Sequence, residues 1–285
     1  MSRRLLAVHA HPDDESSKGA ATYAHYVRSG AEVMVVSCTG GERGDVQNPA
    51  LEPRAMAERD MAGLRRLEMA EAQRILGIDH RWLGYEDSGL PENDEPLPAN
   101  CFALVPVEFS ADPLVRIIRE FRPQVLITYD ESGGYPHPDH IRTHVLAMYA
   151  WEAAADATRY PEHGPAWRIP KVYYDRIFNG DKARAVHGAL VAAAHPAAEG
   201  LGEMVAWMGQ RPSLATTHVD VGAHFETRDA ALRAHASQVP PDSPFFFWPN
   251  DTQREAWPFE DFQLVESSVA SDLPETDLFA GIEET

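Results

Sequence analysis

The sequence has few cysteines, a deficit of basic residues and no long apolar run. Two cysteines, Cys38 and Cys101, are too few for a disulfide framework, so we expect a cytoplasmic protein with reduced thiols. The 25 Lys and Arg residues against 44 Asp and Glu give a formal net charge of −19. We therefore expect no nucleic-acid partner, because phosphate binding requires a basic surface. No apolar run approaches the ~20 residues of a membrane span and no secretory signal pattern is present, so we expect no membrane partner.

The first half contains a regular alternation of short apolar runs and amphipathic segments. Residues 5–8 and 31–38 are predicted strands, and residues 18–30 between them are a predicted helix that a glycine ends. This spacing indicates parallel strand pairing. Further strands are predicted at 80–85 and 125–129, and further helices at 52–76, 114–121 and 141–155. We therefore predict an α/β fold, a three-layer αβα Rossmann-like sheet that is mostly parallel.

The second half has a weaker pattern. Its predicted elements are strands at 171–174 and 217–221 and helices at 183–194 and 226–237. We predict a Rossmann-like metal-site domain over residues 1–167 and a more irregular C-terminal lobe over 168–285 that completes the substrate cleft, with one continuous domain as the alternative. The aromatic stretch 240–257 is expected in the core or in a subunit contact, which leaves a homo-oligomer open. Acidic residues from about 271 predict a loosely held tail.

The first polar cluster directly follows the first predicted strand, where an open α/β sheet places its binding crevice. It contains His11, Asp13 and Asp14. A His and an Asp three residues apart, here His11 and Asp14, can both reach one divalent cation. Asp13 is then left free beside the metal as a base.

A second cluster follows the predicted strand 125–129 and contains Tyr135, His137, Asp139 and His140. Added to His11 and Asp14, His140 completes a His–Asp–His set that leaves one position of a tetrahedral zinc open, as in catalytic sites. Zn²⁺ is the expected cofactor, although Fe²⁺ also suits nitrogen and oxygen ligands.

The neighbouring residues suggest a division of roles. Asp13 is placed to take a proton from the bound water, whose pKa zinc lowers towards ~7. His137 would donate to the oxyanion or protonate the leaving nitrogen, and Asp139 would hold the other imidazole nitrogen of His137. Glu42 and Arg43, in a glycine-bearing loop at the same edge, are candidate substrate contacts, and a solvated turn is the alternative.

At these residues the sequence resembles the PIG-L-like (N-acetylglucosaminyl-phosphatidylinositol de-N-acetylase) superfamily of zinc-dependent amide hydrolases. The resemblance rests on residues 11–15, 68–72, 137–140 and 231–238. Within the superfamily the chain is most similar to the mycothiol S-conjugate amidases, through residues 16–19, 85–91, 133–137 and 275–281.

The resemblance implies zinc on His11, Asp14 and His140, with Asp13 as general base and His137 as the acid or electrostatic partner. These roles agree with those inferred from the residues alone.

Further roles are implied for residues around this centre. Tyr135 would polarise the scissile carbonyl, and Arg65 and Asp87 would bind the glucosaminyl-inositol part of the substrate. Lys18 stands where the related deacetylases usually lack a lysine, which points to recognition of a larger amide.

The implied function is zinc-dependent hydrolysis of the amide bond in mycothiol S-conjugates, small-molecule pseudodisaccharide thiol conjugates. The products would be an S-conjugated N-acetylcysteine (a mercapturate) and glucosaminyl-inositol, in detoxification or natural-product biosynthesis. The alternative is a zinc-dependent de-N-acetylase of N-acetylglucosaminyl-inositol or another N-acetyl sugar. A non-catalytic binding protein would need neither Asp13 nor His137. The sequence leaves open whether the site is reached by His235 and Gln238.

Overall fold

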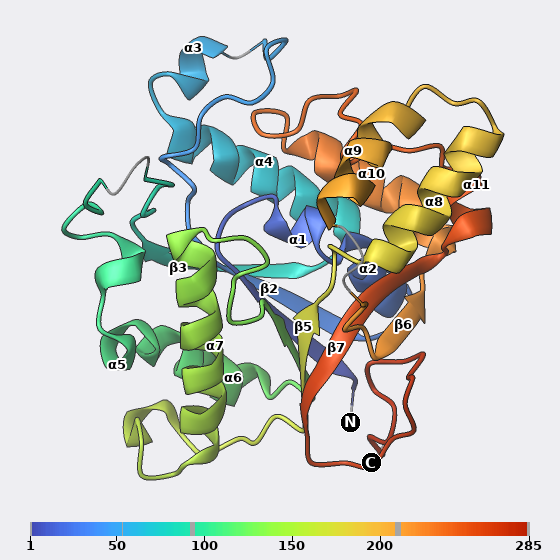
Figure 1. Cartoon of the computed structure of the whole chain (residues 1–285). Helices are drawn as coiled ribbons and strands as arrows, with labels where there is room; N and C mark the ends of the chain where they lie inside the picture. Colours follow the sequence, from blue (N-terminus) through green and yellow to red (C-terminus); the bar gives the residue numbers. More distant parts are fainter. Residues whose placement is uncertain (1, 53, 92–94, 209–211, 284–285) are drawn as a thin grey trace.

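A computed structural model describes residues 2–52, 54–91, 95–208 and 212–283. Within them, seven strands form one sheet in the order β3-β2-β1-β4-β5-β7-β6, with helices on both faces (Figure 1). The strands are β1 (Arg4–His9), β2 (Glu32–Thr39), β3 (Asp79–Tyr85), β4 (Val125–Thr128), β5 (Lys171–Asp175), β6 (Thr217–Asp220) and β7 (Phe259–Ser267). The predicted α/β class with a mostly parallel sheet is confirmed.

Several helices differ from their predicted bounds. The helices are α1 (Asp14–Ser17), α2 (Ala20–Arg28), α3 (Arg54–Ala57), α4 (Met61–Leu76), α5 (Val107–Ser110), α6 (Asp112–Phe121), α7 (Pro138–Ala155), α8 (Gly180–Ala192), α9 (Ala198–Met208), α10 (Phe225–Ala234) and α11 (Asn250–Ala256). The helix predicted over 52–76 is split because Asp60 caps a new start, its carboxylate accepting from the Gly63 N–H at 2.8 Å.

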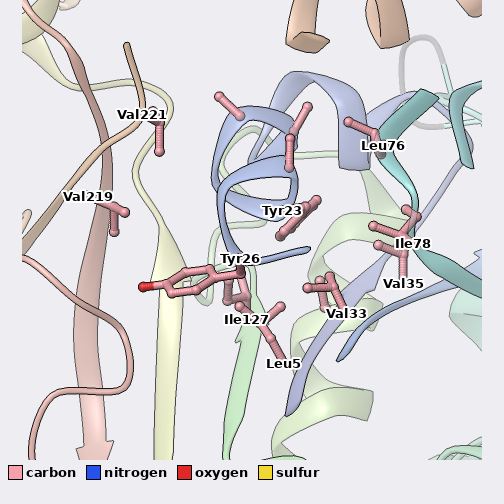
Figure 2. Packing of buried hydrophobic residues seen from close by; sticks show 14 of the residues in the cluster. Leu5, Tyr23, Tyr26, Val33, Val35, Leu76, Ile78, Ile127, Val219 and Val221 are labelled. Atoms are coloured by element: carbon pink, nitrogen blue, oxygen red, sulfur yellow. The ribbon is translucent and has the colours of Figure 1, made fainter. Parts of the chain in front are cut away.

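The alternating strand residues divide the core into two layers, one on each face of the sheet. From β1, Leu5 and Ala7 pack towards the layer that contains α2 and α4 residues, which Figure 2 shows from close by. Leu6 and Val8 point the other way, into the layer that α6 and α7 cover. The period of two along the strand therefore fixes which helices cover which face.

The strand order places two loops side by side at the centre of the sheet. β1 pairs in parallel with β2 on one side and with β4 on the other. The chain therefore moves outward from β1 through β2 and β3, then returns to the other side of β1. The carboxyl ends of β1 and β4 meet at this reversal, which is where open α/β sheets bind ligands.

The C-terminal half extends the same sheet. The predicted strands at 171–174 and 217–221 are β5 and β6, and β7, which the sequence pattern did not reveal, runs antiparallel between them. The sheet thus continues across the predicted boundary between residues 167 and 168. The division into two domains stays a prediction.

The prediction of a loosely held tail from residue 271 is wrong. Glu275 accepts from Tyr173 Oη at 2.7 Å and Thr217 Oγ1 at 2.9 Å, and it forms an ion pair with the buried Lys171. Leu278 is fully buried. The ion pair between Glu275 and the buried ammonium group of Lys171 therefore holds this segment against the sheet. In the described part of the chain, every helix is too short or too polar to cross a lipid bilayer.

Candidate active site

The first site segment is a tight turn between β1 and α1. The His11 N–H donates to Asp14 Oδ2 at 2.9 Å, and the Tyr129 hydroxyl donates to the same oxygen at 2.7 Å. Asp13, between them, has φ of 93°, a left-handed conformation that is costly for a residue with a Cβ. The turn therefore aims Asp14 inward and holds the backbone of Asp13 under strain.

The second site segment is the start of α7, which begins three residues earlier than predicted. His137 is its N-cap residue and accepts the Asp139 N–H on Nδ1 at 3.1 Å, so its ring proton is on Nε2. His140 lies in the first turn, and its Nδ1 donates to the Gly133 carbonyl oxygen at 3.0 Å. That bond leaves His140 Nε2 as an acceptor, 3.5 Å from Asp14 Oδ2 and 3.4 Å from the Tyr135 hydroxyl.

The structure brings the three predicted metal ligands together. One ligand atom each of His11, Asp14 and His140 lies within 4.8 Å of the other two. Burial raises the pKa of Asp14, but Lys18 and His140 outweigh it and hold the carboxyl pKa well below its usual range. Burial lowers the pKa of His140, which keeps its imidazole neutral. Burial lowers the pKa of His11, but its contacts with Asp139 and Asp87 outweigh burial and raise that pKa to about 10, so a metal would bind its imidazole in exchange for a proton. A carboxylate and imidazole nitrogens are the donors that Zn²⁺ and Fe²⁺ bind, so these residues fit such an ion, whose identity stays a prediction.

Asp139 has a different partner from the one predicted. Its carboxylate was expected to hold His137, but it accepts from His11 Nε2 at 3.2 Å and from the Ser88 N–H at 2.9 Å. Only its backbone N–H contacts His137. Because Nε2 of His11 is engaged in this way, Nδ1 faces Asp14 at 3.6 Å and is the nitrogen available to a metal. Asp139 thus orients a metal ligand through a carboxylate–imidazole contact.

Asp13 is held by charged groups on both sides. Its carboxylate pairs with Arg65 Nη2 at 2.8 Å, and its backbone N–H donates to Glu15 at 3.0 Å. Glu15 in turn contacts His235 Nε2 at 2.7 Å, so Glu15 joins His235 to the site. Burial raises the pKa of Asp13 and outweighs Arg65, which favours a role as a proton acceptor. Arg65 orients Asp13 with its guanidinium and also lines the polar pocket described below, so its predicted contact with substrate stays a prediction.

Sequence reasoning missed three residues that support these groups. Tyr129 orients Asp14, Ser88 orients Asp139, and Glu15 joins Asp13 to His235. Tyr129 carried a signal, since its hydroxyl ends an otherwise apolar predicted strand at the binding edge. Ser88 carried none, because its partner lies 51 residues away in sequence.

A polar pocket opens on one side of the metal ligands, with an empty volume of about 1010 Å³. Arg43, Asp87, Tyr135, His137 and Gln238 are among the residues that line it. Glu42 does not line this pocket. Its carboxylate accepts from the Asp87 N–H at 2.8 Å and fixes the loop from within.

A second, largely apolar pocket opens on the other side, with an empty volume of about 590 Å³. Its lining includes Lys18, Tyr135, Phe178, Phe245 and Phe246. The aromatic stretch was expected in the core or in a subunit contact, but two of its rings form a wall of this cleft. Lys18, predicted to contact substrate, lies here while its ammonium group pairs with Asp14.

The chain matches a known protein family and several related enzymes in sequence. The family model of GlcNAc-PI de-N-acetylase (PIG-L) matches residues 6–151. The mycothiol S-conjugate amidase of Streptomyces coelicolor is 52% identical, over 98% of this chain and 97% of that protein. A 1D-myo-inositol 2-acetamido-2-deoxy-alpha-D-glucopyranoside deacetylase of Catenulispora acidiphila is 40% identical, over 99% of this chain and 90% of that protein.

The fold is shared with a solved structure. N,N'-diacetylchitobiose deacetylase from Pyrococcus horikoshii superimposes with a TM-score of 0.63 at 20% identity, covering 93% of this chain and 84% of that one. These relatives are amidase and deacetylase enzymes. By sequence and by fold, the chain belongs to the GlcNAc-PI de-N-acetylase (PIG-L) family.

Proposed function

We propose that this chain is a metal-dependent amidase that hydrolyses mycothiol S-conjugates. The observation that carries the proposal is the pair of unlike pockets that meet at Asp13, Asp14 and Tyr135. The 52% identity to an amidase of that name supports the same substrate class. The products are an S-conjugated N-acetylcysteine and glucosaminyl-inositol, and the context is detoxification or natural-product biosynthesis.

The two pockets suit the two halves of such a substrate. Hydroxyl and amino groups of glucosaminyl-inositol match the charged lining that Arg43 and Asp87 provide in the polar pocket. The acyl half, with its sulfur substituent, matches the aromatic pocket. The scissile amide then lies between them, beside Asp13.

A metal held by His11, Asp14 and His140 would supply Lewis-acid polarisation of the carbonyl and a water of lowered pKa. Asp13 accepts the proton of the attacking water and passes it to the departing amine. Its strained turn and its contact with Arg65 keep that carboxylate at the mouth of both pockets.

His137 and Tyr135 act on the carbonyl oxygen. Burial and the neighbouring His11 lower the pKa of His137 to about 4, so its imidazole is neutral at neutral pH. Because Nδ1 already accepts a hydrogen bond, its Nε2–H is the donor available to the developing oxyanion. Burial raises the pKa of Tyr135, which keeps its hydroxyl protonated as a second donor.

The second candidate is de-N-acetylation of N-acetylglucosaminyl-inositol, for which the 40% identical relative is named. The apolar pocket favours the amidase, because its aromatic lining, which includes Phe178, Phe245 and Phe246, offers an apolar surface that a single acetyl group would not need. Purified enzyme should be offered a mycothiol S-conjugate and N-acetylglucosaminyl-inositol at equal concentration, with product masses as the readout. A higher kcat/KM for the acetylated pseudodisaccharide would overturn the amidase proposal.

Zn²⁺ is the proposed cofactor and Fe²⁺ the alternative. Metal content of freshly purified protein, followed by chelation and separate addition of each ion, decides between them. We also propose a cytoplasmic site of action, which the two free cysteines Cys38 and Cys101 support.

A further inference from the structure

The apolar pocket beside the metal ligands continues into an inner pocket. Seven residues line both, including Lys18, Phe178, Phe245 and Phe246. The ring centroids of Phe178 and Phe245 are 6.3 Å apart, and those of Phe245 and Phe246 are 4.7 Å apart in a T-shaped pair. These rings form one aromatic wall that leads from the reacting centre into the inner pocket.

Three further cations, Arg176, Lys182 and Arg228, line the inner pocket. Arg176 forms an ion pair with Asp130. Arg228 is fully engaged, because its guanidinium donates to Asp229, Gln253 and Asn250. Lys182 lies in the first turn of α8. Among the described residues, its Nζ has no hydrogen-bond or ion-pair partner.

The carboxylates that line the inner pocket are committed to other groups. Asp261 accepts from Asn179, His218 and Trp257. Glu260 accepts from backbone N–H groups of α2, including that of Thr22 at 2.8 Å. The Lys182 ammonium therefore lines a largely apolar cavity without a direct ion-pair partner in the described part of the chain, because Asp261 and Glu260 act on it only through their charges at longer range. A carboxylate on a bound ligand would supply the missing direct contact. In agreement, burial lowers the pKa of Lys182.

We propose that the inner pocket binds the sulfur substituent of the conjugate and that Lys182 selects substituents bearing a carboxylate. The aromatic wall contacts the apolar body of the substituent, and the ammonium of Lys182 meets the anionic group at its end. A charge-assisted hydrogen bond formed inside an apolar cavity is among the stronger polar contacts. This inference rests on the proposed amidase function and adds a specificity-determining residue to it.

Two matched substrates test the inference. Mycothiol alkylated with a benzyl group and with a 4-carboxybenzyl group differ only in the carboxylate. In the unaltered enzyme we expect the carboxybenzyl conjugate to have the higher kcat/KM. Lys182→Met should lower kcat/KM for that conjugate by about 10- to 100-fold, the range for a hydrogen bond to a charged group, mainly through KM. The benzyl conjugate should change by less than about threefold, since the methionine keeps the apolar length of the side chain.

Two further variants are the controls. Lys182→Arg should retain the preference for the carboxylate. Arg116→Met removes an exposed cation on α6, on the opposite face of the sheet. It should leave kcat/KM unchanged for both substrates. Thermal unfolding midpoints equal to that of the unaltered protein show that each variant is folded.

The outcomes separate this inference from the function on which it rests. If the unaltered enzyme and Lys182→Met have the same ratio of carboxybenzyl to benzyl kcat/KM, the selectivity role of Lys182 is wrong and the amidase function stands. If the unaltered enzyme hydrolyses neither conjugate, the amidase function itself is wrong.

Discussion

Replacing Asp139 by asparagine tests how the metal ligands are oriented. The Asp139 carboxylate is fully buried and accepts from His11 Nε2 and from both the N–H and the hydroxyl of Ser88. An asparagine of the same shape has one acceptor oxygen, so it satisfies at most two of these three donors and carries no charge. The variant therefore weakens the contact with Asp139. In the unaltered protein that contact fixes the tautomer of His11 and directs its Nδ1 towards the metal.

The expected loss is in metal affinity. Removing such a carboxylate partner of a ligating histidine typically weakens binding by about 10- to 100-fold, which corresponds to about 1.4–2.8 kcal/mol. Competition with a chromogenic chelator gives the metal Kd for Asp139→Asn and for the unaltered protein. Most of the lost activity should return when the metal is supplied in excess.

Asp130→Asn is a matched control for this variant. Asp130 also follows β4, but its carboxylate contacts Ser132 and Arg176 rather than a metal ligand. Its metal affinity should be unchanged. An unchanged metal Kd in Asp139→Asn, together with an altered pH profile of kcat, would instead support the originally expected contact with His137 and refute this reasoning.

Three other variants address catalysis, stability and pH dependence. Asp13→Asn should lower kcat by about 10²- to 10⁴-fold, the usual contribution of a general base, with metal content unchanged; near-normal turnover would contradict the role. Lys171→Met should lower the free energy of unfolding, measured in urea, by about 3 kcal/mol, because it leaves Glu275 without its buried counter-charge. A loss below ~1 kcal/mol would show that water hydrates the Glu275 carboxylate in place of the lysine. Burial raises the pKa of Glu15, but His235 outweighs it and lowers that pKa from 4.5 to about 2. The contribution of the Glu15–His235 contact to the free energy of unfolding is therefore present above pH 4.5 and lost as the pH falls towards 2. Over this pH range, the free energy of unfolding of Glu15→Gln should change less with pH than that of the unaltered protein.

One physical rule explains why the first half of the sheet and the proximity of the two polar clusters could be predicted from the sequence. Strands buried on both faces are continuous apolar runs, and the residues that follow them lie at one edge of a parallel sheet. His11, Asp14 and His140 could be grouped by this rule alone. The partner of Asp139 could not, since it depends on side-chain directions in the first turn of α7.

The second half was harder to predict because its signals are weaker and its contacts more distant. β7 (Phe259–Ser267) lies at the antiparallel end of the sheet, and its sequence FEDFQLVES is neither a continuous apolar run nor a regular alternation of apolar and polar residues. Phe245 and Phe246 gave an aromatic signal that is equally typical of a core and of a cleft wall. Their position beside the metal ligands depends on how the segment between α10 and α11 packs against distant parts of the chain, which no local pattern encodes.

The buried contact between Lys171 and Glu275 has a consequence for incomplete chains. Lys171 begins β5, in the middle of the sheet, whereas its counter-ion is supplied by a segment 104 residues later in the chain. A nascent polypeptide that has not yet reached residue 275 would have to bury a lone ammonium ion, which is costly, or leave this part of the sheet open to water. The order in which the chain is made therefore separates the two charges, and the sheet acquires its full stability only after the later one has been synthesised.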